Sequence, residues 1–204
     1  MPDRYHDQEG KTVAFRTMSG FFPEPILKDC LELWRAINVP MPVPDQLSLM
    51  HRDGCPEKYW HIDGVVPVPG LDDPDNMGQG NEDEIKHLDT RLPEATRNTL
   101  QMLQDMTGIA RARLMSMNSR SCYTIHTDAT PRAHIALQTH DKVWFIIEGA
   151  APFHIPADGS VWIIDTTRKH TVVNGARDGL DRIHIVATVP HEFEEQFRAR
   201  DLTK

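Results

Sequence analysis

The second half of the chain is a series of short β-like runs separated by turn residues. The runs cover residues 110–117, 122–127, 133–139, 143–148, 153–155, 160–165, 170–174 and 182–189. Runs that recur at intervals of roughly 8 to 12 residues, with turn signals between them, are typical of antiparallel double-sheet folds. We therefore predict a mainly β protein whose core is a double-stranded β-helix, the jelly-roll or cupin-like barrel.

The rest of the chain supplies supporting elements for this core. With 204 residues, 39% of them hydrophobic, the chain has the size expected of one compact domain. Apolar residues at helical spacing predict helices over residues 23–38 and 92–106, and a short amphipathic helix near the C-terminus, over residues 191–200. The predicted layout is a single domain: helical support and a Pro-rich lid region (1–108), the catalytic core (109–190) and a C-terminal helix (191–204).

A long Pro-rich stretch, residues 39–83, has no clear periodicity. Its one aromatic and apolar segment, residues 59–68, contains Trp60 and must pack on the body of the protein. It is either a lid over a substrate mouth or a cover for a sheet edge. The acidic, Gly-rich residues 76–84 are expected to form a solvated loop.

Charge and cysteine content exclude several classes of partner. The net charge is −8, whereas nucleic acid and anionic membranes attract clustered Lys and Arg, so we expect neither as a partner. Cys30, Cys55 and Cys122 are odd in number and widely spaced, as expected of reduced thiols in the cytoplasm. No apolar run approaches the roughly 18 residues of a membrane span, so we predict a cytoplasmic location.

Three side chains in the β-rich half form a candidate metal site. His126 and Asp128 are two residues apart, so they point the same way on an extended strand. His170 begins a later run, as expected if it arrives on the facing sheet. Two imidazoles and one carboxylate are the ligand set of non-haem iron(II) oxygenases, in which the remaining metal positions stay open.

The sequence context selects this His-x-Asp pair from several. Four such pairs occur: His51/Asp53, His61/Asp63, His87/Asp89 and His126/Asp128. The first three lie among Gly, Pro and acidic residues, where such pairs are typical of solvated turns. Only the fourth ends a β-like run and is followed by further strand-borne His and Arg residues. For His170 the alternative is an ordinary core histidine bonded to a backbone carbonyl.

The order of several short motifs resembles a known family. The motifs are His-Thr-Asp at 126–128, Arg-Ala-His-Ile-Ala-Leu at 132–137, Gly-Ser-Val-Trp-Ile-Ile-Asp at 159–165, His-Thr-Val-Val-Asn at 170–174 and Arg-Ile-His-Ile-Val at 182–186. They resemble the catalytic half of the aspartyl/asparaginyl β-hydroxylase-like family of 2-oxoglutarate dioxygenases, which includes bacterial cis-proline hydroxylases. In the β-hydroxylases proper, a glycine stands at the position matching Asp128, so this chain is nearer the branch with a complete facial triad.

The resemblance implies Fe(II), 2-oxoglutarate and O2 as cofactors and co-substrates. Arg182 matches the arginine that holds the distal carboxylate of 2-oxoglutarate, and a desolvated carboxylate needs such a fixed cation. Arg132 and His134 match a pair that contributes to co-substrate binding. His184, two residues after Arg182, either lines the same pocket or is a core histidine.

The predicted function is hydroxylation of an unactivated C–H bond in an amino acid or an amino-acid residue, with succinate and carbon dioxide as co-products. The substrate partner is thus a small molecule or a peptide, and Arg120 and Trp60 are candidate substrate contacts. Two alternatives remain open: a non-enzymatic cupin-like sensor of a small acid, and a zinc or manganese cupin isomerase. The substrate and the oligomeric state are not determined by the sequence.

Overall fold

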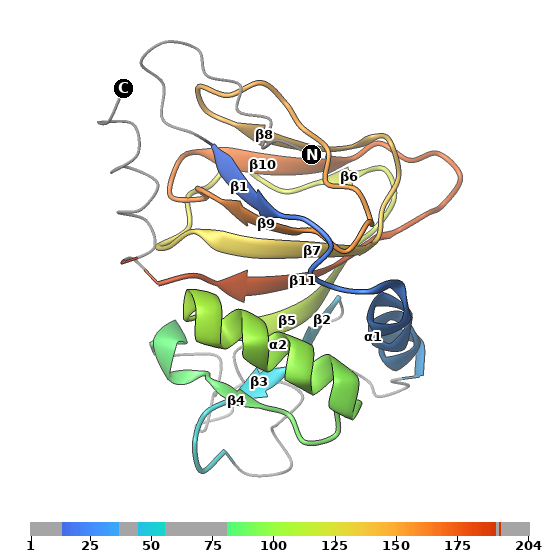
Figure 1. Cartoon of the computed structure of the whole chain (residues 1–204). Coiled ribbons are helices and arrows are strands. Elements are labelled where there is room, and N and C mark those ends of the chain that lie inside the picture. The colour runs from blue at the N-terminus through green and yellow to red at the C-terminus, as the bar shows by residue number, and fades with distance from the viewer. Residues whose placement is uncertain (1–13, 37–44, 56–80, 191, 193–204) are drawn as a thin grey trace, which may run out of the picture.

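The computed structural model describes residues 14–36, 45–55, 81–190 and 192, and two antiparallel sheets form its main body (Figure 1). The larger sheet has the strand order β1-β9-β7-β11-β5-β2 and the smaller sheet the order β6-β10-β8. The larger sheet contains β1 (Phe15–Met18), β9 (Val161–Ile164), β7 (Arg132–Gln138), β11 (Arg182–Thr188), β5 (Ala110–Met117) and β2 (Gln46–Ser48); the smaller contains β6 (Ser121–Cys122), β10 (His170–Asn174) and β8 (Val143–Ile147).

The winding of the chain identifies the fold. From β5 to β11 the odd-numbered strands lie in the larger sheet and the even-numbered strands in the smaller one, so the chain crosses between the sheets at every connection. All strand pairs in these sheets are antiparallel. This alternation is the winding of a double-stranded β-helix, and the predicted mainly β fold is confirmed.

Two helices cover the outer face of the larger sheet, on the side away from the smaller sheet (Figure 1). They are α1 (Glu24–Ala36) and α2 (Glu94–Thr107), close to the predicted ranges. Helix α2 follows Pro93, and it ends at Gly108, whose φ of 69° allows its N–H to donate to the Gln104 carbonyl at 2.7 Å. No helix in the described part of the chain has the length and apolarity needed to cross a membrane.

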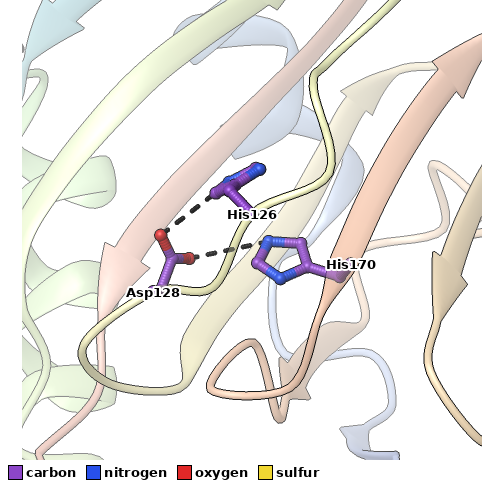
Figure 2. A group of neighbouring side chains, drawn as sticks. All are labelled: His126, Asp128 and His170. Atoms are coloured by element: carbon purple, nitrogen blue, oxygen red, sulfur yellow. Dashed lines mark ion pairs between the residues drawn. The ribbon is translucent and has the colours of Figure 1, made fainter.

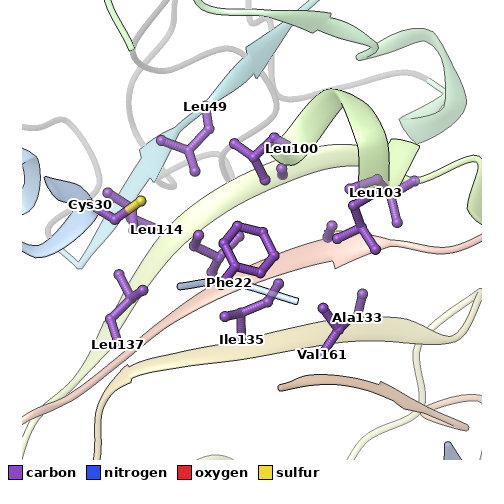
Figure 3. Close-up of a cluster of buried hydrophobic side chains, with 14 of the residues drawn as sticks. Phe22, Cys30, Leu49, Leu100, Leu103, Leu114, Ala133, Ile135, Leu137 and Val161 are labelled. Atoms are coloured by element: carbon purple, nitrogen blue, oxygen red, sulfur yellow. The ribbon is translucent and has the colours of Figure 1, made fainter. Parts of the chain in front are cut away.

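The strands of the larger sheet separate two environments. Ile183 and Ile185 of β11 belong to the apolar cluster between the sheet and the helices, part of which is drawn in Figure 3. Arg182 and His184 alternate with them and therefore face the space between the two sheets. A second apolar cluster, which includes Phe145, fills part of that space. The interior of the barrel is thus apolar in one region and polar in another.

The structure differs locally from the predicted elements. The described part of the Pro-rich stretch is not irregular throughout: β2 extends the larger sheet, and β3 (Met50–His51) pairs with β4 (His87–Leu88). The predicted strand over 122–127 is reduced to β6 and one isolated backbone bridge, and the strand over 153–155 is reduced to a bridge at Phe153. Residue Trp60 and the predicted C-terminal helix over 191–200 lie outside the described residues, apart from Glu192.

Candidate metal centre and buried arginines

His126, Asp128 and His170 converge at one end of the barrel, where Figure 2 shows both imidazoles facing the carboxylate. One ligand atom from each residue lies within 4.8 Å of the others. His126 Nε2 is 4.0 Å from Asp128 Oδ1, and His170 Nε2 is 3.8 Å from Asp128 Oδ2. Within the described residues, this is the one group of His, Cys, Asp or Glu side chains close enough to hold a metal ion.

Backbone pairing brings the two histidines together. The His126 N–H donates to the His170 carbonyl at 3.1 Å, and the His170 N–H donates back to the His126 carbonyl at 2.9 Å. Residues directly opposite each other in an antiparallel pair project their side chains on the same face. The N–H of Asp128 donates to the Thr166 carbonyl at 2.9 Å, which fixes the turn that carries the carboxylate.

The hydrogen bonds of the two imidazoles orient their free nitrogens. His126 Nδ1 lies 2.8 Å from the Thr124 carbonyl, and His170 Nδ1 lies 2.9 Å from the Arg168 carbonyl. A carbonyl only accepts, so each Nδ1 carries the proton and each Nε2 keeps its lone pair. Burial lowers the pKa of His170. A lower pKa favours the neutral imidazole, the form that binds a metal.

A network of ion pairs surrounds the carboxylate of the triad. Arg132 Nε donates to Asp128 Oδ2 at 3.1 Å, and Arg132 Nη1 pairs with Glu82. Glu82 also pairs with Arg111 and accepts a hydrogen bond from the Thr188 hydroxyl at 2.7 Å. Arg132 faces the interior as predicted, but its partners are protein carboxylates. This arrangement disfavours the co-substrate role that the resemblance implies for it.

Glu82 is a residue that the sequence did not single out. It begins the short 3-10 helix η2 (Glu82–Glu84), within a segment predicted to be a solvated loop. Instead, its carboxylate pairs with Arg111 and Arg132 at the end of the barrel. Burial alone would raise the pKa of Glu82, but hydrogen bonds and charges from Arg132, Thr188 and Arg111 outweigh it and bring the pKa to about 2. The only signal in the sequence is a run of acidic residues, which is more often solvated.

Arg111 reaches this network through an irregularity in β5. Val186 pairs with Arg113, but Thr188 pairs with Ala110, so β5 has one extra residue between these pairs. Arg111 adopts φ 49°, a left-handed conformation that is rare for residues other than glycine. Such β-bulges redirect side chains and are common next to active sites. Here the bulge accompanies the pairing of Arg111 with Glu82.

A second polar group lies deeper in the barrel, around Arg182. Arg182 is 1% exposed, and its Nη2 lies 3.0 Å from His184 Nδ1 and 3.3 Å from His134 Nδ1. Its guanidinium carbon also lies 5.4 Å from the centre of the Phe145 ring. Among the described residues, no carboxylate lies within ion-pair distance of Arg182, and its Nε has no hydrogen-bond partner. Of the four residues considered for the co-substrate, Arg182, His134 and His184 lie together, whereas Arg132 lies in the network around Glu82.

Burial controls the charges in this group. It lowers the pKa of Arg182 to about 10, while a hydrogen bond with Tyr123 acts in the opposite direction. Burial, followed by the charge of Arg182, holds the pKa values of His134 and His184 well below their ordinary value. Both histidines are therefore neutral at neutral pH, and Arg182 carries the positive charge.

Arg120, one of the two candidate substrate contacts, does not lie near the triad. Arg120 is exposed in the turn before β6, with φ 57°, and its Nη2 donates to the Arg177 carbonyl at 3.2 Å. Ser121 pairs with Asn174, at the end of β10 remote from His170, so Arg120 lies at the opposite end of the barrel from the triad. Trp60 lies outside the described residues.

The chain was compared with known proteins. No family model matches the sequence, and no curated protein matches it. Similar solved structures include a 2OG-Fe(II) oxygenase family oxidoreductase from Burkholderia pseudomallei, with 23% identity over 49% of this chain and 59% of that chain and a TM-score of 0.38. This chain therefore spans less than two thirds of that structure.

Two prolyl hydroxylases are also similar. One, from Trichoplax adhaerens, was solved with a peptide of hypoxia inducible factor and has 12% identity over 94% of this chain and 87% of that chain, with a TM-score of 0.47. The other, a viral collagen prolyl hydroxylase from Paramecium Bursaria Chlorella virus-1, has 10% identity over 88% and 96% of the two chains, with a TM-score of 0.44. These TM-scores are all below 0.5, so the function is inferred from the side chains of this chain.

Proposed function

We propose that this chain is an iron(II)- and 2-oxoglutarate-dependent dioxygenase that hydroxylates an unactivated C–H bond of an amino acid or an amino-acid residue. Succinate and carbon dioxide are the co-products. The proposal depends on one observation above all: the ligand atoms of His126, Asp128 and His170 lie within 4.8 Å of one another. The motif order over residues 126–186, which resembles that of the aspartyl/asparaginyl β-hydroxylase-like family, supports the proposal.

The donor set fits iron(II). Two imidazoles and one carboxylate are the ligands of the facial triad. Both imidazoles have Nδ1 bonded to a backbone carbonyl and Nε2 free, which is the tautomer that a metal ligand requires. Three protein ligands leave positions open for other molecules, whereas a structural site would be closed by a fourth. His126 is 42% exposed at its side chain, so the site is accessible from outside.

The interior also fits 2-oxoglutarate. A buried guanidinium without a carboxylate is costly, and an acid that binds beside it removes that cost. Arg182 meets this description within the described residues, and its Nε is left without a partner. His184 Nε2 is a second buried nitrogen without a partner. Arg132 is already paired with Asp128 and Glu82, so Arg182 is the better candidate for the distal carboxylate.

Each group of residues has a separate role in the proposed reaction. Iron(II), when bound with dioxygen and 2-oxoglutarate, supplies the oxidation that breaks the C–H bond. His126, Asp128 and His170 hold the metal on one side, and Arg132 orients Asp128 by its hydrogen bond. Arg182 holds the far carboxylate of 2-oxoglutarate. The neutral His134 and His184 leave the charge of Arg182 uncompensated and therefore available to that carboxylate.

One assay separates the proposal from its rivals. The purified protein is incubated with iron(II) and 2-oxoglutarate, with and without a panel of free amino acids and short peptides, and succinate is measured. The proposal requires succinate formation that depends on both additions and is stimulated by a substrate. A cupin-like sensor binds an acid but forms no succinate, and a zinc or manganese isomerase turns over without 2-oxoglutarate.

Asp128→Ala provides the matched variant, because it removes the carboxylate ligand and leaves Arg182 in place. We expect it to abolish succinate formation. Arg177→Gln is the control, because Arg177 is exposed in the connection between β10 and β11, and we expect it to retain wild-type turnover. Equal turnover in Asp128→Ala and the wild type would refute the proposal.

A further inference from the structure

Arg113 is a further buried arginine, and the proposed chemistry gives it no role. It lies on β5, and its side chain faces the space between the sheets, opposite in direction to its neighbour Leu114, which packs in the cluster under the helices. Arg113 is 4% exposed. Its Nη1 donates to Gln46 Oε1 at 2.9 Å, and its Nε has no partner among the described residues.

The charges near Arg113 do not balance. It interacts with two other cations, Arg111 and Arg132, and with two anions, Glu82 and Asp128. Both carboxylates are already paired with arginines: Glu82 with Arg111 and Arg132, and Asp128 with Arg132. In the described part of the chain, three guanidinium groups therefore face two carboxylates, and Arg113 is the one that has no ion pair with either. A buried guanidinium in this state is stabilised strongly by an added anion.

Arg113 is close to the metal triad. Across the larger sheet, Arg113 pairs with Val186, which in turn pairs with His134 on β7. Neighbouring strands are about 4.8 Å apart, so Arg113 is roughly 10 Å from β7. On β7, Arg132 is two residues before His134 and bonds directly to Asp128. The distance between Arg113 and the triad can be spanned by a molecule of the size of an amino acid.

Arg113 and Arg182 are two separate positions for an acid. Arg182 pairs with Met117, four residues along β5 from Arg113. At about 3.3 Å per residue, the two backbone positions differ by roughly 13 Å along the strand. The two arginines therefore start from well-separated positions on the sheet, and a dioxygenase that binds two organic acids requires two such positions.

We propose that Arg113, together with the Gln46 amide, binds a carboxylate of the organic substrate. The substrate class is thus a small free carboxylic acid, such as an amino acid with its own carboxylate, rather than an internal residue of a neutral peptide. Arginine suits this role because its planar fork can donate two parallel hydrogen bonds to a carboxylate. This inference rests on the proposed function and names the substrate class of the same site.

Ligand binding is measured by the shift in melting temperature, with and without manganese(II) and 2-oxoglutarate. The probes are the free L-amino acids, the corresponding amino-acid amides, and 2-oxoglutarate itself. We expect at least one free amino acid, but not its amide, to stabilise the wild type and the Arg177→Gln control. Arg113→Gln should weaken that binding by about 100-fold, the size of a lost charged contact, and leave 2-oxoglutarate binding within a few-fold. Arg182→Gln should show the reverse.

The outcomes distinguish failure of this inference from failure of the proposed function. Three results overturn the substrate assignment: amino-acid binding that survives in Arg113→Gln, an equal response to amides, and no response to any amino acid. In each of these cases 2-oxoglutarate still stabilises the wild type, so the proposed function is not affected. A wild type that does not respond to 2-oxoglutarate or manganese(II) contradicts the proposed function instead. If Arg113→Gln weakens 2-oxoglutarate as much as the amino acid, Arg113 belongs to the co-substrate position and the inference is wrong.

Stability without ligands gives an independent readout. Arg113→Met keeps much of the side-chain volume and removes the unpaired charge, so we expect it to melt at the same temperature as the wild type or higher. Arg113→Lys keeps the charge but loses the planar fork, and it should bind the amino acid more weakly than the wild type. A large drop in the melting temperature of Arg113→Met would mean that a carboxylate of the chain itself holds Arg113, which overturns the proposal.

Discussion

Glu82 and Arg132 are 50 residues apart in the sequence and form an ion pair at the end of the barrel that carries the metal triad. Arg132 also donates to Asp128. Glu82 therefore supports the candidate metal ligand Asp128 through Arg132. The segment before α2 and the larger sheet thus share one electrostatic network.

The first prediction concerns stability at low pH. The pKa of Glu82 falls from 4.5 to about 2 in the folded protein, so the folded state favours the charged carboxylate. This stability is fully present above pH 4.5 and is lost as the pH falls toward 2, and its size is about 3 kcal/mol. Glu82→Gln should lower the free energy of unfolding at pH 7 and weaken its dependence on pH in that window.

Urea unfolding followed between pH 2 and pH 7 measures this effect. Glu84→Gln is the matched control, because Glu84 is exposed and its ion pair to Arg52 is 3.8 Å long, so we expect less than about 1 kcal/mol of change. Equal losses in the two variants would contradict the role given to Glu82.

The second prediction concerns the metal. His126→Ala and His170→Ala each remove one of three ligands, and we expect metal affinity to fall by more than about 100-fold, beyond the effect of losing an outer-shell contact. Calorimetric titration with iron(II) under nitrogen, or with manganese(II), measures it. His140→Ala is the control, because the described partners of its side chain all belong to turns or loops: Asp141, Lys142 and Asp178. A variant of His126 or His170 with wild-type affinity would remove that residue from the triad.

The third prediction concerns 2-oxoglutarate. Arg182→Ala should raise its dissociation constant strongly, because losing a charged contact to a buried carboxylate costs about 2 to 5 kcal/mol. Metal affinity should change little, because the described hydrogen bonds of the Arg182 guanidinium to histidine go to His134 and His184, which are not members of the triad. Unchanged binding of 2-oxoglutarate would shift the anchor to Arg132, and Arg132→Ala would then show the loss.

The fourth prediction concerns the buried histidines of the barrel. Burial and the charge of Arg182 hold the pKa values of His134 and His184 well below 6.5. Below pH 6.5 the unfolded chain binds protons that these residues do not bind in the folded state, so stability falls as the pH decreases. Each group contributes about 1.4 kcal/mol per pH unit. Urea unfolding between pH 7.5 and 5.5 should show a shallower slope for His184→Gln than for the wild type.

The fifth prediction compares two glycines. Gly159 has φ 79°, and a Cβ there would lie 1.9 Å from the Phe22 carbonyl oxygen. Gly179 has φ 86°, and a Cβ there would meet nothing within 4 Å. Gly179→Ala should therefore cost about 1 to 2 kcal/mol from backbone strain alone. Gly159→Ala should cost more than about 4 kcal/mol, because a backbone clash is added. Similar melting temperatures for the two variants would contradict this account.

Strand periodicity accounts for what the sequence predicted correctly. Alternation along β11 placed Arg182 and His184 on one face, and the structure places both inside the barrel. The predicted grouping of His126, Asp128 and His170 also agrees with their positions, although a turn rather than a regular strand carries Asp128. These predictions depend only on local geometry and on the order of the strands. Both can be read from the residue pattern.

Long-range pairing accounts for what the sequence did not predict. Glu82 lies in an acidic segment that is like any solvated loop until Arg111 and Arg132 are placed beside it. Arg120 itself adopts a left-handed turn conformation, and nothing in the residue pattern predicts the direction of its side chain. The burial of Arg113 depends on how β2 extends the larger sheet, which residue periodicity in a Pro-rich stretch does not indicate.

The alternation along the larger sheet has a consequence for how this protein can change. On β11 and β5, residues such as Ile185 and Leu114 hold the fold through the helices, while their immediate neighbours face the site. For the proposed dioxygenase, new substrate preferences can therefore arise, in nature or in a mutant library, by changing inward positions such as Met115 and Val186 without altering the packing that keeps the chain folded. Selection for a different acid and selection for a stable barrel therefore act on alternate residues of the same short strands.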